Sequence, residues 1–237
     1  MADISIADPA ANLSRARADL RVLRRDLIGL IAHRTLWRQT NDAIAERASD
    51  APALWPNHYA WLYAEAQQIA VRRLVRGRSG QVSLSGVLQT LERRPDCVSL
   101  ATIRAIAEVQ EVDEVLALRA VEAFQDEWAT PDGILDRAIP CRDRAALLQR
   151  TSRVLEWVDR NVAHAYDPSD VTVTPPLFSD LDAAIDAAVG VFQRYWQLLN
   201  GVCVAVDLTM LAPDWVRTFD RPLFSRPVEW SPDGIER

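Results

Sequence analysis

Two side chains suited to phosphate chemistry, Arg160 and His164, stand four positions apart in the stretch 153–167, RVLEWVDRNVAHAYD. Apolar residues recur in this stretch at helical spacing, and on a helix residues four apart lie one above the other. A guanidinium offers a phosphate a fixed fork of donors, and an imidazole titrates near neutral pH and can move protons. This is the pair that a metal-independent ribonuclease would use on a phosphodiester.

A solvated helix end explains the same pair without chemistry, because the helix dipole favours cations near a helix C-terminus. Arg153 lies on the same stripe as Arg160 and His164. A second arginine cluster, which includes Arg73 and Arg76, closes a predicted helix beside a Gly/Ser loop. We take Arg153, Arg73 and Arg76 as candidate substrate-binding residues, with the dipole as the same structural alternative.

Composition limits the partners that the chain can attract. The net charge of −6 excludes a general electrostatic attraction to nucleic acid, although all 27 cations are arginine, which binds phosphate in a bidentate manner. A GC-rich genome explains the absence of lysine equally well. The sequence favours narrow arginine-lined sites over a broad basic surface.

The three cysteines, Cys97, Cys141 and Cys203, are odd in number and far apart, so they indicate reduced thiols and neither a disulfide framework nor a zinc site. The N-terminus lacks a basic start and an apolar core, so we expect no signal peptide. The longest apolar run, 202–206, is too short for a membrane span. We therefore predict a cytoplasmic protein without membrane contact, metal or cofactor.

Low glycine and periodic apolar residues predict an all-α, up-and-down helical bundle. The first two helices should form an antiparallel hairpin, the first with a possible kink near Gly29, and a break is expected near 112–113. The predicted helices cover 12–48, 56–76, 84–92, 99–128 in two parts, 143–164 and about 179–200.

Cap signals define the ends of two of these helices. Ser83 is expected to cap the helix 84–92, and 179–182 resembles a capping box whose helix ends before Gly201. Only 171–173 and 202–206 could form strands.

The order of several segments resembles the HEPN superfamily, in its abortive-infection U-type branch. These segments are VDRNVAHAYD, then FSDLDAAIDAAVGVFQRYWQLL, with YAWLYAEAQQIAVRRLVRGRSGQVSLSGVLQTLE before them and DWVRTFDRPLF after them. The resemblance covers about 13–95 and 143–225. It divides the chain into a flexible tail 1–11, one helical domain 12–212 with a helical insertion 97–140, and a C-terminal Trp/Pro-rich tail 213–237 packed on the bundle.

The resemblance implies a homodimer that places an Arg-to-His motif at the dimer cleft, acting on RNA in phage defence or beside an antitoxin. On it His164 matches the motif histidine, Arg160 its arginine and Asn161 the polar position that follows. The chain departs from the family in the spacing, because three residues separate Arg160 from His164 where the family has four to six. Arg160 would hold the phosphate, and His164 would move the proton of the 2′-hydroxyl or of the leaving 5′-oxygen.

Three functions stay open on the sequence. The first is an RNA-cleaving defence or toxin protein, either active or degenerate. The second is a non-catalytic helical module for dimerisation or for binding a partner protein. The third is a small-molecule or nucleotide-binding protein that uses a cleft of the bundle.

Overall fold

A computed structural model of the protein describes residues 8–47, 54–77, 80–162 and 174–201. Within these residues the fold is all-α, with seven α-helices, 83% helical content and no strands. The predicted fold class is therefore confirmed. The two segments proposed as possible strands, 171–173 and 202–206, the C-terminal tail 213–237 and residues 1–7 of the predicted tail 1–11 lie outside the described residues, whereas residues 9–11 of that tail are helical.

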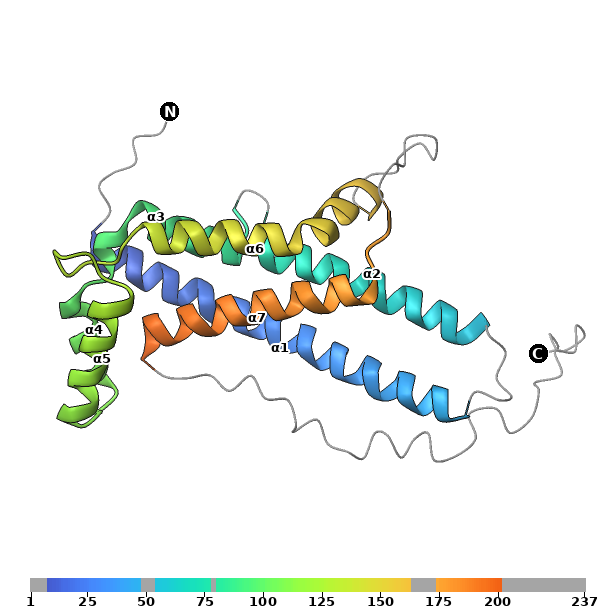
Figure 1. Ribbon diagram of the computed structural model, residues 1–237, viewed down its shortest axis with the longest axis horizontal. Coiled ribbons are helices and arrows are strands. Elements are labelled where there is room, and N and C mark those ends of the chain that lie inside the picture. Colours follow the sequence, from blue (N-terminus) through green and yellow to red (C-terminus); the bar gives the residue numbers. More distant parts are fainter. Residues whose placement is uncertain (1–7, 48–53, 78–79, 163–173, 202–237) are drawn as a thin grey trace, which may run out of the picture.

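Four long helices form a bundle along the longest axis of the molecule (Figure 1). They are α1 (Pro9–Arg47), α2 (Leu54–Val75), α6 (Ala138–Trp157) and α7 (Phe178–Asn200). The shorter α3 (Leu84–Arg93) packs on α6 and α1. At one end of the bundle, α4 (Leu100–Val109) and α5 (Glu114–Glu127) form a helical hairpin that lies across its axis (Figure 1). A 3₁₀ turn (Pro95–Cys97) precedes α4, and a π-helical turn (Val158–Val162) extends α6.

The core is formed by the apolar stripes of the long helices. Leu20, Leu23 and Leu27 of α1 are almost fully buried, as are Phe192 and Tyr195 of α7. Their spacing of three to four residues places each set on one helix face, so the same periodicity that predicts the helices also builds the core.

Ion pairs join α1 to α7, and two of them are close. Arg34 Nη1 lies 2.6 Å from Asp186 Oδ1, and Arg38 Nη2 lies 3.0 Å from Asp182 Oδ2. The arginines are four residues apart on α1 and the aspartates four apart on α7, so both pairs lie on facing helix surfaces. Since the residue numbers rise on α1 as they fall on α7, the two helices are antiparallel.

Most predicted helix ends lie within a few residues of the observed ones. The Ser83 hydroxyl accepts a hydrogen bond from the Gly86 N–H at 3.2 Å, which confirms that cap, and the break near 112–113 separates α4 from α5. Gly201 follows α7 with φ 72°, as predicted from the left-handed conformation that glycine favours after a helix. The helix α1 continues through Gly29.

One helix start and one N-cap were predicted wrongly. Helix α6 begins at Ala138 and not at 143, because Asp136 Oδ1 accepts from the Ala138 N–H at 2.9 Å and Pro140 is tolerated in a first turn. At α7 the N-cap is Leu177 and not Ser179. The Asp180 carboxylate reaches back to the Leu177 N–H at 2.8 Å, so Asp180 has the acidic role of a capping box whose first member lacks a hydroxyl.

None of the helices in the described part of the chain is both long and apolar enough to cross a membrane.

Candidate functional site at the end of α6

The last turn of the α6 helix carries two of the candidate catalytic residues, Arg160 and Asn161, in π-helical geometry. This turn spans Val158–Val162 and follows the α-helical part without a break. A π turn adds a residue to the helical ring, so side chains on it leave the regular α-helical stripe, and such turns occur often at functional sites. The expectation that Arg160 continues a plain α-helical stripe was therefore wrong.

Asn161 stabilises this turn. Its side-chain Nδ2 donates to the carbonyl oxygen of Trp157 at 3.2 Å. In a regular α-helix that carbonyl accepts from the backbone N–H of residue 161. The amide of Asn161 thus satisfies the carbonyl at the point where α geometry ends, which gives this residue a structural role in the described chain.

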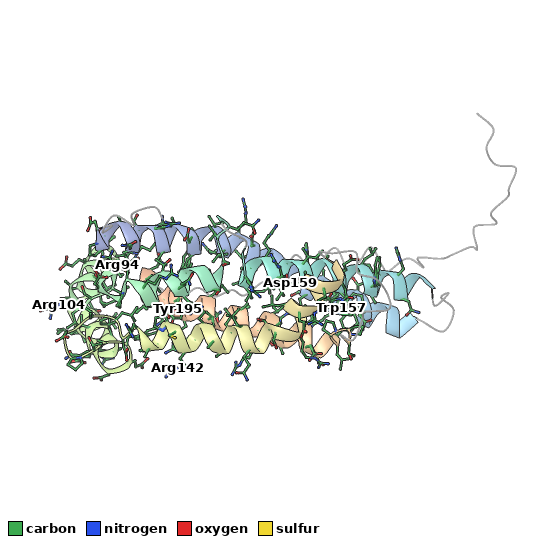
Figure 2. The ribbon with its side chains drawn as sticks, turned by 90° about the horizontal axis from the view of Figure 1, so that it is seen from above. Arg94, Arg104, Arg142, Trp157, Asp159 and Tyr195 are labelled. Carbon is green, nitrogen blue, oxygen red and sulfur yellow. The ribbon has the colours of Figure 1, made fainter. Side chains whose placement is uncertain are left out.

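Asp159 connects the π turn to α2. Its Oδ1 lies 3.0 Å from Arg72 Nε, and its Oδ2 lies 3.9 Å from Arg76 Nη1. The Arg72 side chain is only 19% exposed, so this ion pair is shielded from water more than most surface pairs. Figure 2 shows Asp159 beside Trp157 at the end of α6, well separated from Arg94 and Arg104. The arginine cluster of α2 and the candidate motif of α6 therefore meet at one place.

Arg160 lies on the outer surface of the turn. Its Nη2 forms an ion pair with Glu156 Oε1 at 3.1 Å, and both side chains are about half exposed. An exposed pair between residues four apart on a helix is weak and is screened by salt. A phosphodiester carries one negative charge shared by two non-bridging oxygens, as a carboxylate does, so it can compete with Glu156 for this guanidinium.

The other candidate arginines are divided between this place and its neighbours. Arg76 reaches Asp159, whereas Arg73 Nη2 points to Asp26 of α1 at 3.3 Å. Arg153 Nη1 binds Asp180 Oδ1 at 3.0 Å, which ties α6 to the first turn of α7. Arg76 therefore lies at the π turn, against the residue that precedes Arg160 in the chain, whereas Arg153 and Arg73 are in ion pairs that join helices.

His164 lies outside the described residues. The pairing of Arg160 with His164 therefore stays a prediction.

Sequence reasoning missed the partners of these arginines. Asp159 is adjacent to Arg160 in the chain, yet no sequence pattern relates it to Arg72, which is 87 residues away. Residues 156–160 contain two acids and one arginine, so the available local signals were the neighbouring Asp159 and the Glu156–Arg160 spacing, and neither points to α2.

An aromatic cluster, defined here as Trp37, Tyr59, Tyr63 and Phe178, lies at the start of α7. Trp37 stacks on Tyr63 with ring centroids 4.7 Å apart and on Phe178 at 5.5 Å. Burial raises the pKa of Tyr63 to about 12, so its hydroxyl stays protonated at neutral pH. Phe178 is 44% exposed, which leaves an aromatic ring at the surface two residues from the Asp180 that binds Arg153.

In the described ranges no group of three or more histidine, cysteine or acidic side chains is arranged to hold a metal ion. No family model, curated protein or solved structure matches the chain.

Proposed function

We propose that the chain is a HEPN-like RNA-cleaving protein of a phage-defence or toxin–antitoxin system, with its catalytic pair, Arg160 and His164, at the end of α6. The observation that carries the proposal is the ion pair of Arg76 with Asp159, which brings an arginine from the end of α2 to the π turn that holds Arg160, four residues before His164 in the chain. Two guanidiniums from different helices suit one phosphate better than a single cation.

The proposed roles follow from the chemistry of these groups. The pair of Arg160 with Glu156 is exposed and therefore weak, so Arg160 can exchange that carboxylate for the scissile phosphate. His164 moves the proton between the 2′-hydroxyl and the leaving 5′-oxygen, so the product carries a 2′,3′-cyclic phosphate. Arg76 adds positive charge beside the phosphate, and Asn161 maintains the turn that presents Arg160.

The test compares wild type with His164→Ala and Arg160→Ala in growth arrest and cellular RNA integrity. Arg150→Ala is the matched control, because Arg150 is an exposed arginine two to three turns earlier on the same helix. We expect wild type and the control to arrest growth and degrade RNA, and both site variants to be silent. Purified protein should cleave RNA in excess EDTA and leave 2′,3′-cyclic ends. A wild type that leaves RNA intact at high expression would refute the enzyme.

A second candidate, a non-catalytic module for dimerisation or for binding an antitoxin or defence partner, is favoured by an exposed apolar stripe on α2. Trp61, Leu62 and Ile69 are 58%, 45% and 43% exposed. Leu62 and Ile69 are two turns apart and share a helix face, and exposed patches of this kind mark protein contacts. Here Arg160 remains paired with Glu156 and no RNA is cleaved.

Light scattering tests this module directly. We expect the wild type to have the mass of a homodimer and Ile69→Asp to have that of a monomer. Val22→Asp is the control, because Val22 of α1 is similarly exposed at 47% but lies on another helix. If the wild type is a monomer, the homodimer is refuted for both candidate functions. If it is a dimer without nuclease activity, only the second candidate function is supported.

A further inference from the structure

A groove of about 550 Å³ lies at the far end of the bundle from Arg160, between α4, α5 and the end of α7. Its walls are largely apolar, from Ile103, Ile106, Leu116, Phe124 and Leu198. Gly201, the last residue that the structure describes, is part of the lining. The volume is in the range of sites that bind a small molecule or a short peptide.

Helix α5 is incompletely covered by the rest of the described chain. Val115, Leu116 and Leu118 are 61%, 50% and 54% exposed. The helix packs chiefly on α4, and only Val121 and Phe124 are buried along it. Of these three side chains Leu116 lines the groove, and an exposed apolar side chain there is stabilised in water when another apolar segment covers it.

Gly201 brings the chain into direct contact with the groove wall. Its φ of 72° ends α7 in the left-handed conformation, and its N–H donates to the Gln197 carbonyl at 2.8 Å. A Cβ at this position would lie 2.6 Å from Ile106 Cγ2 on α4. The backbone can pass so close to α4 only because residue 201 has no side chain.

We propose that the apolar run 202–206, VCVAV, occupies this groove in the same molecule. The run begins at the residue after Gly201, so the linkage gives it an effective concentration of the order of millimolar, well above that of a second copy at micromolar concentration. Five extended residues span roughly 16 Å. The groove wall from Leu116 to Phe124 is roughly 12 Å long at the helical rise, so the run can cover it.

The chain contains the reporters for this proposal. Cys203 is the second residue of the run, Cys141 is exposed on α6, and Cys97 is buried in the core. Burial also raises the pKa of the Cys97 thiol to about 11, which keeps it protonated and unreactive. In one full-length sample, the rate of alkylation at each cysteine, relative to its rate in urea, can be measured by mass spectrometry.

We expect Cys203 to react at least tenfold more slowly than Cys141 in the native protein, and Cys97 to react slowest. Leu116→Glu should raise the Cys203 rate to that of Cys141, because a carboxylate in the groove opposes the apolar run. Leu118→Glu is the matched control. It makes the same change on the same helix at similar exposure, outside the groove lining, and should leave Cys203 protected.

Three results would overturn the proposal. The first is a native Cys203 that reacts as fast as Cys141. The second is an equal effect of Leu116→Glu and Leu118→Glu on Cys203, with Cys97 still protected. The third is protection that falls on dilution, because the occupant would then come from a second molecule. A Leu116→Glu variant that exposes Cys97 has lost its fold, and Ala123→Glu, which also lines the groove, replaces it in the comparison.

Discussion

The ion pair between Arg72 and Asp159 should contribute more to stability than the exposed pair that presents Arg160. Arg72 Nε and Asp159 Oδ1 are 3.0 Å apart, with side chains 19% and 35% exposed. Two unit charges about 4 Å apart attract by about 4 kcal/mol at an effective dielectric constant of about 20. Desolvation, side-chain ordering and screening by the water that still reaches Asp159 offset most of this. We expect a coupling energy of about 1–2 kcal/mol.

The assay is a double-mutant cycle by urea unfolding with Arg72→Gln, Asp159→Asn and the double variant. The cycle isolates the Arg72 term from that of Arg76, which also approaches Asp159. A second cycle on Glu156 and Arg160, which are 3.1 Å apart and about half exposed, is the internal comparison and should give about 0.3–0.5 kcal/mol.

The reasoning is refuted if the first coupling energy is below about 0.5 kcal/mol or does not exceed the second. In that case partial burial of the Arg72–Asp159 pair would not increase its coupling energy, and this pair would not be what attaches the π turn to α2. If the expected difference is found, salt should weaken the Arg160 pair more than the Arg72 pair, since exposed charges are screened more strongly.

Two further predictions concern backbone strain and pH. Gly201→Ala should lower the free energy of unfolding by about 1–3 kcal/mol, because Gly201 has a φ of 72° and an added Cβ would collide with Ile106. Gly190→Ala should raise the free energy of unfolding by about 0.5–1 kcal/mol, because an added Cβ there meets nothing within 4 Å. Urea unfolding of both variants checks the two signs. The folded state binds the Cys97 proton more tightly than the unfolded state, because burial raises its pKa from 9.0 to about 11. The contribution of Cys97 to the free energy of unfolding is therefore complete below about pH 9 and should be lost as the pH rises toward about 11, by about 1.4 kcal/mol per pH unit at most. Cys97→Ala should remove this pH dependence of the free energy of unfolding. The same pH dependence in the wild type and the variant would contradict the assignment to Cys97.

The sequence predicts the helices well because their signals are local. Apolar spacing, the Ser83 cap and the glycine after α7 act within one or two turns of the chain. The start of α6 was missed because the carboxylate that accepts from its first N–H belongs to Asp136, one residue before the N-cap and outside the periodic stretch, and because Pro140 looks like a helix breaker although it lies in the first turn.

The candidate site was predicted only in part, for the opposite reason. Arg160 and Arg76 were named from local pattern, and Arg76 lies at the π turn that holds Arg160 because Asp159 attracts it across the contact between α2 and that turn. That contact depends on how two distant segments pack, which no spacing in one segment encodes. The π turn is also invisible to a 3.6-residue periodicity, since it adds a residue without changing residue types.

The charged contact between α1 and α7 has a mechanical consequence. If α7 slid along α1 by one turn in one direction, Arg34 would meet Asp182, which is already 3.9 Å away, and Arg38 would meet Phe178. A slide in the other direction would bring Arg38 to Asp186 and Asp182 toward Asp42. Each one-turn displacement therefore keeps one ion pair and loses the other. The two arginines thus oppose sliding of α7 along α1, and the helix registers one turn away on either side each retain one ion pair.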